Sequence, residues 1–248
     1  MSKVIFESNL VTIPANWQAP EHITAFTTTR AAGFSRNKNY FSLNLAMHAN
    51  DDKYAVELNR KKINEYIGHE VKWLKQKHTN TVIQAEKNNY NVNADAVFTN
   101  NRGTVCAVLT ADCVPILLTD TQGTFVAAIH AGWKGLATNI IKNTIQKIKS
   151  DNIIAWIGPC ICYKCYNIGP EVKDIFCTIQ PKLHSCFSVK DNKFHANLNE
   201  ISETLLRLEG VRQISSANLC TKNHKNDLFS ARRDGINSGR IASCIWIK

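Results

Sequence analysis

The stretch that decides the fold is TVCAVLTADCVPILLTDTQGTFVAAIH, residues 104–130. It contains three short apolar runs, over 104–110, 114–119 and 124–130, and turn residues separate the last two. Apolar runs of this length, bounded by turn residues, are typical of buried strands. We therefore expect three neighbouring core strands, the last of which ends at an imidazole, His130.

The sequence around this stretch mixes helical and strand patterns. After the glycine-rich GWKG, Ile140, Ile141, Ile145 and Ile148 recur at helical spacing, which predicts an amphipathic helix. Further strands are predicted over 153–158 and 241–247, shorter runs over 71–74 and 81–83, and further helices over 54–66 and 198–208. Because strands and helices do not alternate strictly, we expect an α+β fold with mixed sheets flanked by helices, in a single domain over 1–248.

Composition indicates an ordinary globular protein. The chain has 248 residues, of which 44% are hydrophobic and 20% charged, so it can bury one substantial core. Its apolar runs are too short and too interrupted for a membrane span. The N-terminal MSKVIFESNLV lacks the basic and apolar segments of a signal peptide, and nine cysteines is an odd number for a disulfide framework. We expect a cytoplasmic protein with reduced thiols.

The net charge of +10 favours anionic partners. The basic residues are dispersed, and no helix-turn-helix, RNA-binding or zinc-finger signature is present, so we expect no nucleic-acid partner. A small phosphate-bearing ligand fits this charge, although a merely well-solvated surface fits it too.

Three side chains that can hold a metal lie at the ends of predicted strands. Cys113 lies between two apolar runs, His130 ends the next run, and His78 stands between two shorter runs. Two imidazoles and one thiolate form the ligand set of an open zinc site. The alternative is that Cys113 is a small buried hydrophobic residue.

Four ordered motifs resemble a known family: TADCVPILLTD (110–120), AAIHAGWKGL (127–136), IGPCI (157–161) and ARRDGINSGRIA (231–242). They are similar to the laccase-domain or multicopper polyphenol oxidase family, also labelled the peptidoglycan editing factor family. Its members are also described as purine nucleoside phosphorylases with adenosine deaminase activity. The resemblance implies zinc held by His78, Cys113 and His130, and a fold like the catalytic domain of cytotoxic necrotizing toxins.

The chain departs from the family pattern at four positions without losing a metal donor. Thr79 stands where Gly is usual, Lys134 where Arg is usual, Ala231 where an aromatic residue is usual, and Asn167 where Glu is common. Lysine keeps the charge of arginine but loses its bidentate geometry.

Several chemistries compete under the family's names. The chain has eight histidines but no His-x-His pair from which a trinuclear copper centre is built, so zinc is favoured over copper. The signature of zinc nucleobase deaminases, His-x-Glu followed by Pro-Cys-x-x-Cys, is also missing. The pair Cys162 and Cys165, with Cys160 nearby, invites a second metal or a redox role.

Phosphorolysis of a purine nucleoside is the reaction we favour. Arg30, Arg232 and Arg233 are candidates to bind phosphate, together with N–H groups of GWKG, although the arginine pair can equally be structural. We assign acid–base catalysis to Asp112, beside the catalytic metal donors Cys113 and His130. Asn44 and His48 are candidate contacts for ribose or base.

Two rival functions belong to other classes. A cysteine hydrolase would use Cys113 as nucleophile and His130 as base. A zinc-stabilised scaffold would have no catalytic role. Neither the preferred nucleoside nor the oligomeric state has a signature in the sequence.

Overall fold

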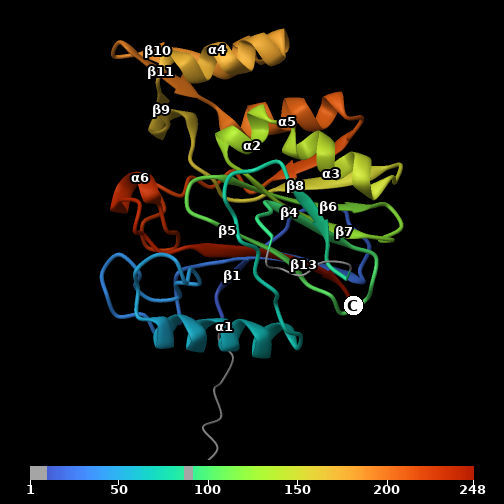
Figure 1. The fold of residues 1–248 in the computed structure, drawn as a ribbon, viewed down its shortest axis with the longest axis vertical. Helices are drawn as coiled ribbons and strands as arrows, with labels where there is room; N and C mark the ends of the chain where they lie inside the picture. Colours follow the sequence, from blue (N-terminus) through green and yellow to red (C-terminus); the bar gives the residue numbers. More distant parts are fainter. Residues whose placement is uncertain (1–9, 87–91) are drawn as a thin grey trace, which may run out of the picture.

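The computed structural model describes residues 10–86 and 92–248. Figure 1 shows the elements stacked in layers: one helix covers a first sheet, a second sheet packs on the first, and further helices cover the second. This arrangement of mixed sheets and helices confirms the α+β prediction. Of the N-terminal segment considered above as a signal peptide, residues 1–9 lie outside the described residues.

The first sheet is antiparallel and has the order β1-β2-β13-β5. Its strands are β1 (Thr12–Pro14), β2 (Ile23–Thr28), β13 (Ile241–Ile247) and β5 (Cys106–Thr110). Its outer face packs on helix α1 (Lys53–Ile67), where Phe26 and Trp246 join Ile63 and Ile67 in one buried cluster. Asp52 caps the first turn of α1, and the helix ends at Gly68, whose φ of 79° suits glycine.

The second sheet has six strands in the order β12-β8-β6-β7-β4-β3. The outer pairs β12–β8 and β4–β3 are parallel, and the inner pairs are antiparallel. The bounds are β12 (Gln213–Ser216), β8 (Ile153–Ile157), β6 (Val114–Asp120), β7 (Val126–Ala131), β4 (Ala96–Thr99) and β3 (Val82–Gln84). This sheet shares a core with the first sheet on one face and meets helices on the other.

Helices α2 (Trp133–Ala137), α3 (Ile140–Ile148) and α5 (Leu198–Leu208) cover the outer face of the second sheet (Figure 1). We expected one helix after GWKG, but the structure has two. The chain breaks between them at Asn139, which adopts a left-handed φ of 69°. The short helix α6 (Ala231–Asp234) lies at the side of the molecule (Figure 1).

A third, small sheet lies at one end of the molecule beside α4 (Pro170–Ile179), beyond the helical layer (Figure 1). It has the order β10-β11-β9 and consists of β10 (Phe187–Lys190), β11 (Lys193–Ala196) and β9 (Asn167–Ile168). Two 3-10 turns, Tyr163–Cys165 and Pro181–Cys186, connect this region. Among the described residues, no helix combines the length and the apolar character that a membrane crossing requires.

The predicted strands have the right type but one of them lies in a different sheet. Residues 114–119 and 124–130 form the paired strands β6 and β7, whereas 104–110 forms β5 in the first sheet. The expectation of three neighbouring strands was therefore wrong. Asp112, at a φ of 92°, lies in the sharp connection that carries the chain from one sheet to the other. The run over 71–74 makes only an isolated bridge, between Val71 and Val105.

Candidate metal centre

His78, Cys113 and His130 meet at the end of the second sheet. His78 lies in the loop before β3, Cys113 immediately precedes β6, and His130 belongs to β7, where it pairs with Pro115 of β6. Their donor atoms all lie within 4.8 Å of one another, and Cys113 Sγ is 3.7 Å from His78 Nε2. The ring centroids of the two histidines are 4.8 Å apart. One ion can therefore be shared by all three side chains.

A buried carboxylate, Asp95 immediately before β4, holds both histidines in place. Asp95 Oδ1 lies 2.7 Å from His130 Nδ1, so Nδ1 donates and Nε2 faces the other donors. Asp95 also accepts the N–H groups of His78 at 3.1 Å and Thr79 at 2.6 Å. These bonds stabilise the left-handed backbone of His78, whose φ is 59°. The Thr79 hydroxyl adds a bond of 2.8 Å to the same carboxylate, so this departure from the family pattern supports the site.

The pKa values of Cys113, His130 and Asp95 favour metal binding. Burial would raise the pKa of Cys113, but the charge of His130 and hydrogen bonds from both histidines lower it to about 6. Burial would lower the pKa of His130, but Cys113 and Asp95 raise it to about 9. Burial likewise opposes ionisation of Asp95, yet hydrogen bonds from His130 and Thr79 hold its pKa at about 2. The thiolate is ready at neutral pH, and an arriving metal displaces the proton of His130.

Gly132 leaves room for the donors. A Cβ at this position would lie 2.7 Å from His78 Cδ2, which is closer than real Cβ contacts allow, and 3.1 Å from Cys113 Sγ, which is tighter than most of them. A side chain here would displace two of the three donors. The space, the mixture of imidazole and thiolate, and the carboxylate behind His130 together fit a zinc ion with one open position.

The donors line a cavity of ≈380 Å³. Six of the predicted site residues line it: His48, His78, Asp112, Cys113, His130 and Arg232. Sequence reasoning missed Arg240, Tyr166 and Trp133, which line it too. Arg240 lies near the end of the motif ARRDGINSGRIA, and Trp133 lies in AAIHAGWKGL. Their positions within these motifs could have identified both as candidate site residues. Asp95, in contrast, stands in no motif that we singled out.

Arg232 and Asp112, which both line this cavity, are joined by a hydrogen bond. Asp112 accepts the Arg232 N–H at 2.7 Å and the Thr221 hydroxyl at 2.5 Å. The Arg232 guanidinium lies 4.7 Å over the Tyr166 ring and donates to the carbonyl and side-chain oxygens of Asn167. Asp112 therefore anchors the backbone that presents Arg232.

Three other predicted residues lie elsewhere. Arg30 donates to the carbonyls of Phe41 and Lys225, and with Arg233 it lines a separate groove. Arg233 pairs with Asp234 and donates to backbone carbonyls. Arg233 therefore has the structural role that the sequence left open as the alternative to phosphate binding. Asn44 is fully buried, donates to Asp51 and accepts the N–H groups of two other residues. These three side chains are not among those that line the metal cavity.

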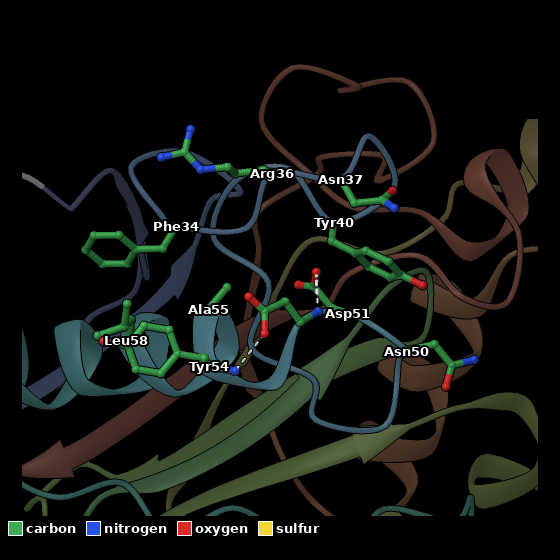
Figure 2. Close-up of a pocket in the computed structure, with 10 residues that line it drawn as sticks. Phe34, Arg36, Asn37, Tyr40, Asn50, Asp51, Tyr54, Ala55 and Leu58 are labelled. Atoms are coloured by element: carbon green, nitrogen blue, oxygen red, sulfur yellow. Dashed lines mark hydrogen bonds between the residues drawn. The ribbon is translucent and has the colours of Figure 1, made fainter.

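A different hollow lies beside the N-terminus of α1 (Figure 2). Its labelled residues include Phe34, Tyr40, Asp51 and Tyr54, and the dashed lines mark hydrogen bonds among the residues at the helix start. Asp51 also accepts the Ser35 hydroxyl at 2.6 Å, so its carboxylate serves the local fold. We assign no chemistry to this hollow.

Comparison with known proteins places this chain in one family. The profile described as multi-copper polyphenol oxidoreductase laccase matches residues 24–248, and the chain belongs to that family. The resemblance drawn from the sequence motifs is thereby confirmed.

Individual relatives match nearly the whole chain. A Haemophilus influenzae protein named purine nucleoside phosphorylase is 41% identical, over 95% of this chain and 99% of its own. The Escherichia coli purine nucleoside phosphorylase YfiH is 36% identical, over 95% of this chain and 98% of its own. A crystal structure of a Neisseria meningitidis protein has a TM-score of 0.92 at 37% identity, covering 96% of this chain and 99% of the other.

Proposed function

We propose that the protein is a zinc-dependent purine nucleoside phosphorylase whose active site is the cavity around His78, Cys113 and His130. The observation that carries the proposal is that these donors and the cations Arg232 and Arg240 line the same cavity of ≈380 Å³. The relatives named purine nucleoside phosphorylase support the same activity. The substrates are phosphate and adenosine, inosine, guanosine or methylthioadenosine.

Phosphorolysis joins a phosphate oxygen to the ribose anomeric carbon while the bond to the purine nitrogen breaks. Arg232 is suited to bind the phosphate because its two acceptors on Asn167 are neutral, which leaves its charge for the anion. Burial lowers the pKa of Arg240, although the charges of Cys113 and Asp112 oppose this shift. Arginine is effectively always protonated in proteins, so Arg240 is a cation. The two arginines attract and orient phosphate.

The leaving base meets aromatic and imidazole groups of the same cavity. Tyr166 and Trp133 offer ring faces against which a planar purine can pack. Burial and the charge of Arg240 lower the pKa of His48, which favours the neutral imidazole, and its one N–H can donate a hydrogen bond to the departing purine. The acid–base role of Asp112 stays a prediction. The two hydrogen bonds that its carboxylate accepts, from the Thr221 hydroxyl and the Arg232 N–H, instead suit it to positioning Arg232.

The three donors would hold zinc, and the ion would supply Lewis-acid polarisation and a bound water with a pKa near neutrality. The chain's own contribution there is the carboxylate of Asp95, which fixes the His130 tautomer.

The decisive test measures products and the dependence of rate on phosphate. We expect ribose 1-phosphate and free base in equal amounts and a rate that rises with phosphate concentration. Replacement of Arg232 by alanine should lower kcat/KM for phosphate about 10- to 150-fold, since charge-assisted hydrogen bonds contribute about 1.5–3 kcal/mol. Zinc content should not change in this variant.

A matched control is Arg207→Ala, which removes an exposed arginine of α5 that pairs with Glu203. It should leave phosphate use unchanged. Turnover at the wild-type rate without phosphate would refute phosphorolysis, and ammonia release from adenosine under those conditions would indicate deamination. Normal phosphate dependence in Arg232→Ala would remove Arg232 from the mechanism.

Two alternatives fit the structure less well. Within residues 10–86 and 92–248, donors gather closely enough to share a metal at two places, and one of these contains histidine. Two histidines there are too few for a multicopper centre. A cysteine hydrolase finds support in the order Asp95–His130–Cys113, but His78 approaches the same sulfur, and a metal-held thiolate is a poor nucleophile.

A further inference from the structure

A second group of metal donors lies outside the proposed active site. Cys162 and Cys165 bound the 3-10 turn Tyr163–Cys165, in which the Cys165 N–H donates to the Cys162 carbonyl at 3.0 Å. Cys220 follows β12 in the sequence. A parallel bridge between Cys160 and Cys220 joins the two segments.

The three sulfurs of this group converge. The Sγ atoms of Cys162, Cys165 and Cys220 all lie within 4.8 Å of one another. Sulfurs around a tetrahedral zinc are separated by about 3.8 Å, because each Zn–S bond is about 2.3 Å long. The Cys162 N–H points to the Cys220 sulfur at 3.4 Å, which stabilises a thiolate there.

We propose that Cys162, Cys165 and Cys220 bind a second, structural zinc ion. The side-chain oxygen of Asn223, 3.3 Å from Cys165 Sγ, is placed to complete the site, alone or through water. Soft thiolates select zinc over hard cations. The two groups of donors share no residue, so the second ion would bind independently of the first. The site borders a separate cavity of ≈390 Å³, which Cys162 and Cys220 line.

A metal accounts for the cluster better than the alternatives do. A disulfide uses two sulfurs and leaves the third unexplained, and all nine cysteines are unpaired in the structure. The bridge between Cys160 and Cys220 brings the two segments together, but it does not require all three side chains to be cysteines with their sulfurs facing one another. Cys-x-x-Cys in a tight turn, with a third cysteine supplied from elsewhere, is a common arrangement of structural zinc sites.

The second zinc would fasten two loops that support the proposed active site. Next to Cys162, the Ile161 N–H donates to the Asp112 carbonyl at 3.0 Å. Next to Cys220, the Thr221 hydroxyl donates to the Asp112 carboxylate at 2.5 Å. Asp112 in turn anchors Arg232. A zinc ion that holds both loops would therefore restrain Asp112, in the connection between the two sheets, through its backbone carbonyl and through its carboxylate.

The experiment uses the full chain with the first site disabled, as His78→Ala/Cys113→Ala. We expect this parent variant to retain roughly one zinc per chain by elemental analysis. Adding Cys165→Ser should remove that zinc. Adding Cys177→Ser, a partly buried cysteine of α4, is the matched control and should retain it.

A second measurement needs no cysteine variant. In the parent, zinc should protect Cys162, Cys165 and Cys220 from alkylation, and cobalt should give a thiolate-to-metal charge-transfer band. Equal alkylation of these cysteines with and without zinc overturns the proposal. Full zinc retention after Cys165→Ser overturns it too, as does a disulfide between two of the three cysteines in protein purified without oxidant.

Discussion

Asp95 shows how much a single residue decides in this protein. Its carboxylate is fully buried and accepts hydrogen bonds from His130, His78 and Thr79. It therefore sets the tautomer of one histidine and the backbone of the other. A carboxylate behind a metal-binding histidine also raises the basicity of that ligand.

Asp95→Asn should weaken zinc binding at the His78–Cys113–His130 site about 10- to 100-fold. The amide keeps the size of the carboxylate but loses its charge, and its NH2 group faces donors that need an acceptor. Competition with a chromophoric chelator measures the affinity, in the Cys165→Ser background so that the first site is observed separately.

Asp120→Asn is the matched control. Asp120 is another buried carboxylate that accepts N–H groups, from Gln122 at 3.1 Å and Thr124 at 2.9 Å, but it lies at the far end of β6. This variant should lose stability and keep its zinc affinity. An equal loss of affinity in both variants would contradict the role we give to Asp95.

Strand β6 is the element on which the layers depend. Ile116 and Leu118 belong to the core beneath the helices, whereas Leu117 belongs to the core between the sheets. All three side chains are fully buried. A strand buried on both faces is apolar throughout, which explains why the sequence shows a continuous run there instead of an alternation.

Ile116→Ala and Leu117→Ala should therefore each lower the free energy of unfolding by about 2–5 kcal/mol, measured by urea titration. Each removes buried methyl groups and leaves a cavity, although the two side chains point to opposite faces. Val189→Ala in β10, where the side chain is 65% exposed, should change stability by less than about 0.5 kcal/mol. A loss confined to one of the two β6 variants would show that one face is not a packed core.

At the scale of the whole molecule, the candidate metal site brings together segments that are far apart in the sequence. His78 comes from the loop before β3, Cys113 from the connection between the two sheets, and His130 from β7. A ligand that binds the native state but not the unfolded chain stabilises the fold by mass action.

Zinc at 100 times its dissociation constant should add about 2.7 kcal/mol of stability, which raises Tm by about 5–10 °C for a chain of this size. Calorimetry of zinc-loaded and chelated protein measures the difference. In Cys113→Ala the difference should shrink to whatever the cysteine cluster contributes. An unchanged difference in that variant would mean that Cys113 is not a ligand.

The sequence by itself determined most of the local elements and pointed to the three candidate metal donors. The predicted helix over 198–208 and strand over 241–247 coincide with α5 and β13, because apolar spacing reports which face of an element is buried. His78, Cys113 and His130 were candidates because each lies beside or at the end of a predicted strand, and the family resemblance strengthened that choice; the structure brings their donor atoms within 4.8 Å of one another. These signals are local, so they can be read from the sequence without knowing the order of strands in the sheets.

Only the tertiary structure decided how the elements are partnered. Strand β5 lies in the other sheet. Arg30, Asn44 and Arg233 make internal hydrogen bonds. Asp95 contacts His130, and Arg240 lines the same cavity as the three candidate donors. The tertiary structure also brought Cys220 to Cys162 and Cys165. Pairing of distant segments depends on the packing of two sheet faces and on the sharp turn at Asp112, and periodicity along the chain carries no information about either.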